Sequence, residues 1–186
     1  AVKEKVVAAV PAGAHVLEVG CGTGELAAML VAAGATVDGF DQSPTMVEVA
    51  RERELGGFTV REMGVEGMDG FADGAYGAVV ATLVFSELSD DERRYALRHA
   101  FRVLEPGGRL VVADEVIPRG TRQRLLHALL RAPAVAAVYL AFRASTRPVA
   151  DLAGDVRAAG FQVVSEERSH GDAFSLLVAE RLPEAA

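Results

Sequence analysis

The chain has 186 residues, which at about 150 residues per domain predicts one domain with at most a small appendage. Hydrophobic residues make up 51% and charged residues 24%, which argues against a largely disordered chain, and the single cysteine excludes a disulfide framework or a metal site built from several cysteines. The net charge of −7 disfavours nucleic acid as a partner, and we expect none.

Strand and helix patterns alternate along the chain. In chain order we expect a strand at His15–Val19, a helix that Gly34 ends, a strand at Thr36–Phe40, a helix over 43–55, a strand at Phe58–Arg61, a loop over 64–74, a strand at Ala78–Phe85, a helix over 89–104, a turn at 106–108, a strand at Arg109–Ala113, a basic helical segment over 119–147, a helix at about Val149–Ala159, and a closing hairpin of Phe161–Glu167 and Ala173–Glu180. This order predicts an α/β fold with a parallel sheet covered by helices on both faces, to which the hairpin adds an antiparallel strand.

Two serines mark where helices begin. Ser43 and Pro44 form the pattern of an N-cap followed by the first helical residue. Ser89 is followed three residues later by Glu92, which is the pattern of a capping box.

The first strand is followed by glycines at positions 20, 22 and 24, which let the backbone turn tightly and let a ligand approach it closely. Asp41 ends the second strand and can accept hydrogen bonds from both hydroxyls of a ribose. In sheets of this kind ligands bind beyond the carboxyl ends of the strands, where the glycine loop and Asp41 meet. Together these features predict a site for an adenosine nucleoside.

The glycine spacing distinguishes between nucleoside cofactors. The dinucleotide fingerprint has the spacing G-x-G-x-x-G, whereas this chain has G-x-G-x-G followed by Glu25. A carboxylate in the first helical turn opposes a pyrophosphate but is compatible with a positively charged ligand. The loop therefore disfavours a nicotinamide-dependent oxidoreductase.

Three sequence motifs resemble those of the class I S-adenosylmethionine-dependent methyltransferases. They are VLEVGCGTG at 16–24, VDGFDQSPTM at 37–46 and RVLEPGGRL at 102–110. The resemblance implies a Rossmann-like, doubly wound sheet of seven strands in the order 3-2-1-4-5-7-6 with strand 7 antiparallel. It also implies S-adenosylmethionine as the cofactor and S-adenosylhomocysteine as the product.

Matched by position, the family's cofactor contacts fall on residues of five segments. These are the loop residues Glu18, Gly20, Cys21, Gly22 and Gly24 for the methionine half, Asp41 for the ribose, Gln42 and Met46 beside the adenine, Gly64, Val65 and Glu66 at the adenine edge, and Thr82 at the amino acid end. The family's usual adenine-binding acid aligns with Val65, so either Glu66 takes over or that contact is lost. The usual aspartate before strand four is Gly77 here.

Acidic residues also follow strands four and five. Glu87 lies near the expected active face, where it could accept a proton, hold a cationic acceptor or be a solvated loop acid. We interpret Asp114 and Glu115 as acids on the rim of the site rather than as metal ligands. The four histidines show no ligand spacing, and we expect no metal site.

One segment is strongly basic. Residues 116–150 hold six arginines and no acidic residue, beside an apolar stripe at helical spacing. The segment is either a helix that packs on the sheet with its arginines toward water, or a lid or docking surface for an anionic amphiphile, a membrane surface or an acidic protein partner. Arg119, Arg122 and Arg124 could recognise an anionic group of the acceptor. Residues 121–151 also resemble the methyltransferases associated with corrinoid proteins.

These patterns predict one methyltransferase domain over residues 1–186, with a basic amphipathic helical lid at about 119–147. We expect in-line transfer of a methyl group from S-adenosylmethionine to a small molecule, a lipid-like molecule or a protein. The alternative is a non-catalytic binding module that keeps the cofactor pocket. The longest uncharged apolar run, 132–142, is shorter than the roughly 18–20 residues that span a bilayer, and residues 1–10 show no signal-peptide pattern, so we expect a cytoplasmic protein.

Overall fold

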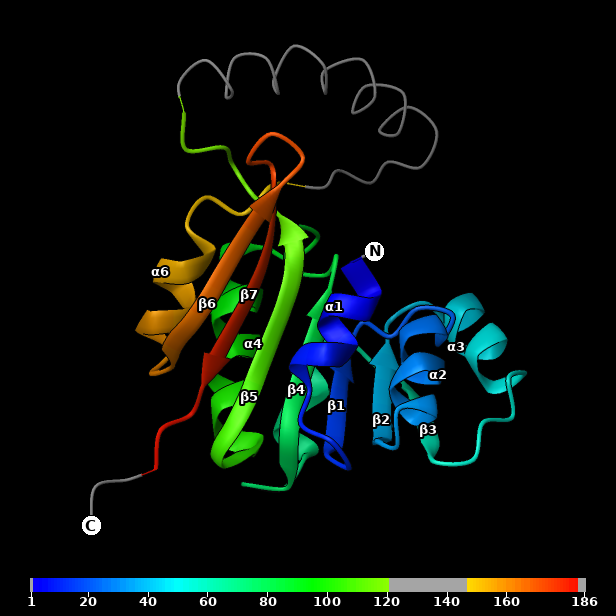
Figure 1. Cartoon of the computed structure of the whole chain (residues 1–186). Helices are drawn as coiled ribbons and strands as arrows, with labels where there is room; N and C mark the ends of the chain where they lie inside the picture. The colour runs from blue at the N-terminus through cyan, green and yellow to red at the C-terminus, as the bar shows by residue number, and fades with distance from the viewer. Residues whose placement is uncertain (1, 121–146, 184–186) are drawn as a thin grey trace, which may run out of the picture.

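The computed structural model describes residues 2–120 and 147–183, and Figure 1 shows their arrangement. In chain order the elements are α1 (Val2–Ala9), β1 (His15–Val19), α2 (Glu25–Ala32), β2 (Thr36–Asp41), α3 (Pro44–Arg51), β3 (Phe58–Glu62), the 3-10 helix η1 (Val65–Gly70), β4 (Tyr76–Thr82), α4 (Asp90–Val103), β5 (Leu104–Glu115), α6 (Leu152–Ala158), β6 (Gln162–Ser169) and β7 (Phe174–Glu180).

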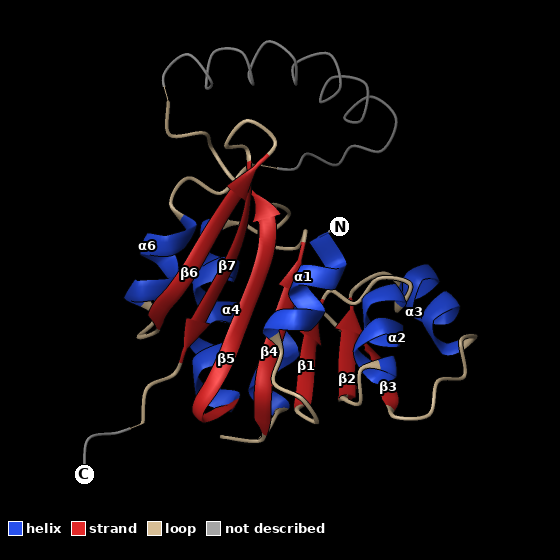
Figure 2. Cartoon of the chain, viewed as in Figure 1, coloured by secondary structure: helices blue, strands red, loops and turns tan. Residues whose placement is uncertain are grey.

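The strands form one sheet in the order β3-β2-β1-β4-β5-β7-β6 (Figure 2). β1 pairs in parallel with β2 on one side and with β4 on the other, so that Val16 lies opposite Val37 and Ala78. β7 runs antiparallel to both β5 and β6. The expected strand order and the expected antiparallel strand are confirmed.

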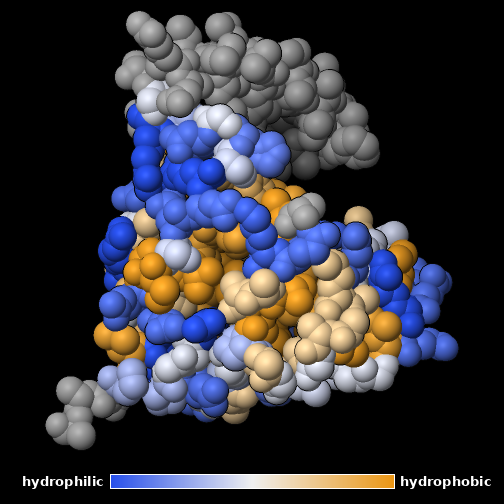
Figure 3. All heavy atoms as spheres, viewed as in Figure 1, coloured by the Kyte–Doolittle hydropathy of each residue, from blue (hydrophilic) through white to orange (hydrophobic). Residues whose placement is uncertain are grey.

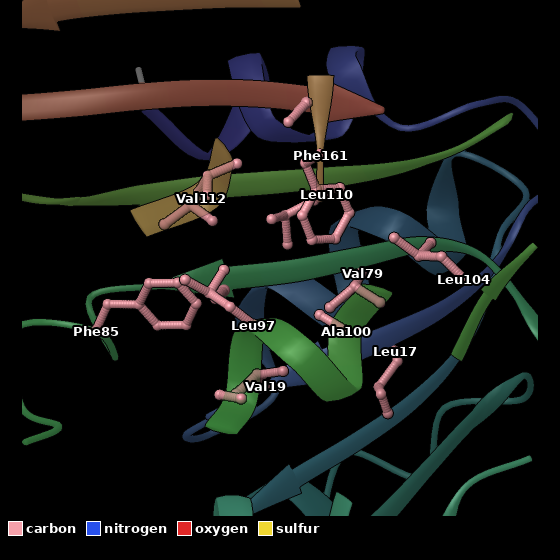
Figure 4. Packing of buried hydrophobic residues seen from close by; sticks show 14 of the residues in the cluster. Leu17, Val19, Val79, Phe85, Leu97, Ala100, Leu104, Leu110, Val112 and Phe161 are labelled. Carbon is pink, nitrogen blue, oxygen red and sulfur yellow. The ribbon is translucent and has the colours of Figure 1, made fainter. Parts of the chain in front are cut away.

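Helices cover both faces of the sheet because side chains of the central strands alternate between them. On β1, Val16 belongs to a buried cluster that includes residues of α1 and α2, whereas Leu17 belongs to a second cluster that includes residues of α4 and α6. Figure 4 shows the second layer, in which Val79 and Leu110 of the sheet face Leu97 and Ala100 of α4. In Figure 3, apolar residues gather in the middle of the face that carries α1, with hydrophilic residues around them.

The predicted helix starts are present. The Ser43 hydroxyl accepts a hydrogen bond from the Met46 backbone N–H, and Pro44 is the first residue of α3. At α4 the capping box is complete, since Ser89 and Glu92 each bond the other's backbone N–H. Each cap satisfies a backbone donor that the first helical turn leaves free.

Several element boundaries differ from the expected ones because of long-range contacts. β5 begins at Leu104 instead of Arg109, because Leu104 pairs with Tyr76 of β4 and because Gly107 and Gly108 exchange backbone hydrogen bonds with Arg181. The helix expected from Val149 begins at Leu152, because Val149 forms a β-bridge with Val116.

Local backbone conformation accounts for two further differences. β4 ends at Thr82 rather than at Phe85, because Leu83 has a positive φ of 58° that an extended strand does not allow. α3 ends at Arg51 rather than near Leu55, and Glu54 has a φ of 47°. Gly77 lies inside β4, not before it.

Two elements were not anticipated from the sequence. α1 precedes the first strand, and η1 occupies part of the expected 64–74 loop. Most of the expected basic lid, residues 121–146, lies outside the described residues. Within the part of the chain that the structure describes, no helix combines the length and apolar character needed to cross a membrane.

Candidate functional site

A pocket of about 340 Å3 opens at the carboxyl ends of β1, β2, β3 and β4. The loops that follow these four strands supply its walls. The sequence-predicted residues that line it are Gly20, Gly22, Asp41, Gln42, Met46, Gly64, Val65, Glu66, Thr82 and Glu87. The fold therefore brings together residues that lie up to 67 positions apart in the chain, at the place expected for a sheet of this kind.

Three predicted residues lie behind the pocket wall instead of in it. Gly24 is the N-cap residue of α2, and a side chain there would press against Phe58. Cys21 is buried, and burial raises the pKa of its thiol to about 12, so it is not a reactive thiolate. Glu18 is 3% exposed at the end of β1. Direct contact of these three with a ligand stays a prediction.

The first wall of the pocket is the glycine loop after β1. Gly20 has a φ of 66°, and a Cβ at this position would collide with the Val84 side chain from the loop after β4. Glycine is therefore required at this position both for backbone conformation and for close packing. The loop presents bare backbone to the pocket, which a ligand can approach closely.

Asp41 forms the second wall, and its carboxylate is fixed in place by the backbone. One oxygen accepts a hydrogen bond from Gly22 N–H at 2.8 Å, and the other accepts one from Ser43 N–H at 2.9 Å. An ionised carboxylate offers about four acceptor positions, so two are left unused by the described residues. Two free acceptor positions at the end of β2 suit the two hydroxyls of a ribose.

Two buried polar groups near the glycine loop have unused hydrogen-bonding capacity. Thr82 lines the pocket, and its hydroxyl makes no hydrogen bond to any described residue. Glu18 also has one oxygen without a partner among these residues. Burial raises the pKa of Glu18 to about 8, against the opposing effect of Lys3, and the charge of Asp41 adds to the rise. Such orphaned polar groups fit a site that is completed by a polar ligand.

The third wall, Gly64–Glu66, is held in place by α4. The Tyr95 hydroxyl donates to the Glu66 carbonyl at 3.0 Å. The Arg102 guanidinium donates to the carbonyls of Met68 at 2.9 Å and Phe71 at 2.8 Å. Val65 is buried and carries no carboxylate. The acid on this wall is Glu66, whose carboxylate folds back over Gly64.

The fourth wall is the loop of residues 83–88 between β4 and α4. Glu87 lines the pocket here. Its pKa is raised by desolvation and by the negative charges of Asp114 and Asp41. This carboxylate is therefore protonated at higher pH than an isolated glutamate, which suits it to proton transfer.

The interpretation of Asp114 as a rim acid is wrong. Its side chain is fully buried, and it accepts hydrogen bonds from the backbone N–H groups of Phe85 and Glu115, each at 2.7 Å. Asp114 therefore binds the chain's own backbone instead of facing a ligand. Glu115 belongs to β5 and does not line the pocket.

The expected anion-binding arginines are only partly described. Arg119 lies away from the pocket, where its guanidinium pairs with Glu166 at 2.5 Å and its backbone N–H donates to Asp172. Arg122 and Arg124 lie outside the described residues. Among the residues that the structure describes, no group of three or more histidine, cysteine or acidic side chains could hold a metal ion.

A model of the family described as a methyltransferase domain matches residues 16–108, which is half of the chain. The chain belongs to this family. The matched segment contains every residue that lines the pocket, and the resemblance seen in the three sequence motifs is confirmed. S-adenosylmethionine is the cofactor of these methyltransferases, and the free acceptor positions of Asp41 and the unpartnered Thr82 hydroxyl fit it.

Two curated relatives are similar in sequence to about half of this chain. Over 104 residues the chain is 41% identical to a demethylmenaquinone methyltransferase of Thermus thermophilus, which covers 54% of this chain and 46% of the relative. Over 123 residues it is 40% identical to methyltransferase GfsG of Streptomyces halstedii, covering 60% and 41%. The alignments thus span less than half the length of either relative.

Solved structures share the fold over almost the whole methyltransferase chain. An S-adenosylmethionine-dependent methyltransferase from Mesorhizobium loti matches with a TM-score of 0.75 and 18% identity, covering 96% of both chains. The [4+2]-cyclase SpnF also matches with a TM-score of 0.75, at 21% identity, covering 97% of this chain and 80% of its own. At these identities the likeness extends to the fold alone.

Sequence reasoning missed the residues that hold the methyltransferase pocket in shape. Arg102 and Tyr95 look like ordinary polar residues of an amphipathic helix, and their partners are backbone carbonyls. Val84 reads as part of a strand, although it packs over Gly20. The sequence held one signal for the role of Asp114. This acid directly follows a fully apolar strand run, and an acid buried there needs hydrogen-bond partners.

Proposed function

We propose that this methyltransferase domain binds S-adenosylmethionine in the pocket and transfers its methyl group to an acceptor beside loop 83–88. The observation that carries the proposal is the Asp41 carboxylate, which two backbone N–H groups orient while two acceptor positions stay free. A nucleoside with two ribose hydroxyls matches those positions.

The other walls supply the remaining cofactor contacts in this proposal. Gly20 and Gly22 give the methionine half close access to backbone, and the Thr82 hydroxyl provides a hydrogen-bonding group for its amino acid end. Gly64 and Glu66 face the adenine. When bound, the cofactor supplies a methyl group that its sulfonium already activates for displacement.

The protein's main contribution is then to align the acceptor. Holding two reactants in attack geometry can supply about 7–11 kcal/mol of the barrier. Glu87 stands in the pocket wall beyond the cofactor contacts, and its raised pKa suits it to accept the proton that the acceptor loses. The proposal therefore assigns Glu87 the role of general base or orienting group.

The fold does not identify the methyl acceptor, because proteins that share one fold catalyse many different reactions. Because the Thermus thermophilus relative is a demethylmenaquinone methyltransferase, a reduced demethylmenaquinone is the first acceptor to try. An amphipathic lipid and a protein acceptor remain as further candidates. An anionic acceptor held by Arg119, Arg122 and Arg124 also stays a prediction.

The test is formation of S-adenosylhomocysteine from methyl-labelled S-adenosylmethionine in the presence of each acceptor. We expect acceptor-dependent product, and at cofactor concentrations below saturation Asp41→Ala and Glu87→Gln should each reduce it. Asp91→Asn is a matched control, because this exposed acid on α4 lies outside the pocket and pairs only with Arg94 among the described residues. Cofactor binding without turnover on any acceptor would favour the non-catalytic binding module.

A further inference from the structure

The loop of residues 83–88 begins in an unfavourable backbone conformation. Leu83 has a φ of 58°, a left-handed value that leucine adopts rarely, and its side chain is 49% exposed. Such a conformation persists only where the surrounding structure holds it. One restraint is a hydrogen bond of 2.9 Å from Leu83 N–H to the Ala113 carbonyl of β5.

The next residue along β5, Asp114, restrains the loop by accepting hydrogen bonds from backbone N–H groups. One carboxylate oxygen accepts the Phe85 N–H at 2.7 Å, and the other accepts the Glu115 N–H at 2.7 Å. The buried Ser86 is the third hydrogen-bond partner, through its side chain and its backbone N–H. Asp114 is fully buried and no described cation pairs with it, so these hydrogen bonds provide its stabilisation.

The carbonyl side of the loop is restrained by other elements. The Arg93 guanidinium of α4 donates to the Phe85 carbonyl at 3.4 Å, and it is itself held by Asp155 of α6 at 2.9 Å. The Arg147 N–H donates to the Ser86 carbonyl at 2.7 Å. Figure 4 shows the Phe85 ring beside Leu97 of α4, where it is buried in the core. Phe85 is thus the anchor point of the loop.

The position of this loop sets the shape of the pocket on two sides. Val84 packs directly over Gly20 of the glycine loop, while Leu83, Glu87 and Leu88 line the pocket beyond it. A shift of Phe85 would move all four of these side chains, because they are its near neighbours in the chain. The hydrogen bond between Asp114 and Phe85 therefore acts on both the cofactor side and the acceptor side.

We propose that Asp114 is a positioning residue: through the Phe85 N–H it holds loop 83–88 against the glycine loop, and so sets cofactor affinity and the placement of Glu87. The expected effect on catalysis, through the placement of Glu87, rests on the proposed function. The restraint on the loop can be measured without any acceptor.

The test compares Asp114→Asn with Ser175→Ala. Asparagine has the shape of aspartate but keeps only one acceptor oxygen and sets an NH2 group against N–H donors of the chain, so at least one of the backbone hydrogen bonds from Phe85, Ser86 and Glu115 is lost. Ser175 lies opposite Asp114 in the β5–β7 pairing, is fully buried, and donates to Glu166 at 3.1 Å. Its removal perturbs the same region of the core without touching the loop.

Two quantities are measured well below the melting temperature: S-adenosylhomocysteine affinity by calorimetry, and amide hydrogen exchange over residues 83–88. For Asp114→Asn we expect about tenfold weaker binding, because ligand binding must then also order the loop that the lost hydrogen bond held. We also expect at least about tenfold faster exchange in the loop, with β1 to β3 unchanged. Ser175→Ala should lower the melting temperature but change neither quantity.

The outcomes separate the inference from the proposed function. If Asp114→Asn melts at a lower temperature but keeps wild-type affinity and loop exchange, Asp114 is only a core residue and the inference is wrong. If wild-type protein does not bind S-adenosylhomocysteine, the proposed function fails, and the exchange comparison still decides whether Asp114 holds the loop. If Asp114→Asn does not fold, wild-type exchange decides: S-adenosylhomocysteine should slow exchange at Phe85 and Ser86, and no change there would overturn the inference.

Discussion

The carboxylate of Asp41 joins two segments of chain, because it accepts one N–H from Gly22 and one from Ser43. These bonds orient it before any ligand arrives, so less ordering is required when a ribose binds. The glycine loop, Asp41 and the helix caps were predictable from sequence because each depends on neighbouring residues. Asp114 and Arg102 were not, because their partners are backbone atoms of distant segments.

For Asp41→Ala we expect S-adenosylhomocysteine affinity to fall by about 1.5–3 kcal/mol, the worth of hydrogen bonds to a charged group. Calorimetric titration measures the loss directly. Asp41→Asn is the matched variant, since it keeps one acceptor oxygen and should bind between alanine and wild type. An unchanged affinity for Asp41→Ala would place the ribose elsewhere.

Glu18 should make stability depend on pH. Burial raises its folded pKa to about 8 from an ordinary value of 4.5, so between these values the folded state holds a proton that the unfolded state has released. The contribution of this group is complete below pH 4.5 and is lost as the pH rises to about 8. Each tenfold difference in proton affinity between the folded and unfolded states corresponds to about 1.4 kcal/mol of stability.

Glu18→Gln isolates this effect because glutamine stays neutral. Urea unfolding of the ligand-free proteins at about pH 5 and about pH 8 should show wild type losing a few kcal/mol more than the variant over this interval. Parallel pH profiles for the two proteins would show that Glu18 is ionised in the fold.

At the scale of elements, α4 supports the side of the pocket that Gly64–Glu66 forms. Arg102 and Tyr95 reach from this helix to backbone carbonyls of η1 and the residue after it.

The existence and type of most elements followed from local patterns. Their ends did not, since Gly107 bonds to Arg181 and Val116 pairs with Val149 across long separations. Leu83 likewise ends β4 although its sequence context favours a strand.

Arg102→Ala should destabilise the protein by about 1.5–3 kcal/mol, because buried carbonyls of η1 lose a charged donor. It should also weaken S-adenosylhomocysteine binding, since Gly64–Glu66 would no longer be held. Arg94→Ala on the same helix is the control. This arginine is exposed and bonded to the exposed Asp91, so its loss should cost less than about 1 kcal/mol. Equal losses for both variants in urea unfolding would show that Arg102 does not support η1.

At the scale of the whole molecule, the family match and the pocket occupy the same half of the chain. All lining residues fall within residues 16–108, whereas the rest of β5 and the β6–β7 hairpin complete the sheet. Among the residues that line this pocket, Gly20, Gly22 and Asp41 lie within the sequence motifs, and their contacts with a cofactor stay a prediction. The acceptor could not be predicted from these motifs, because it depends on the shape of loop 83–88 and on segments that the family motifs do not cover.

The measurement that tests this account most directly is a calorimetric titration of the protein with S-adenosylhomocysteine, with a reduced nicotinamide cofactor as the control ligand. We expect micromolar binding of S-adenosylhomocysteine and no comparable binding of the nicotinamide, since the glycine spacing departs from the dinucleotide fingerprint. Tighter binding of the nicotinamide, or no binding of S-adenosylhomocysteine, would contradict this account.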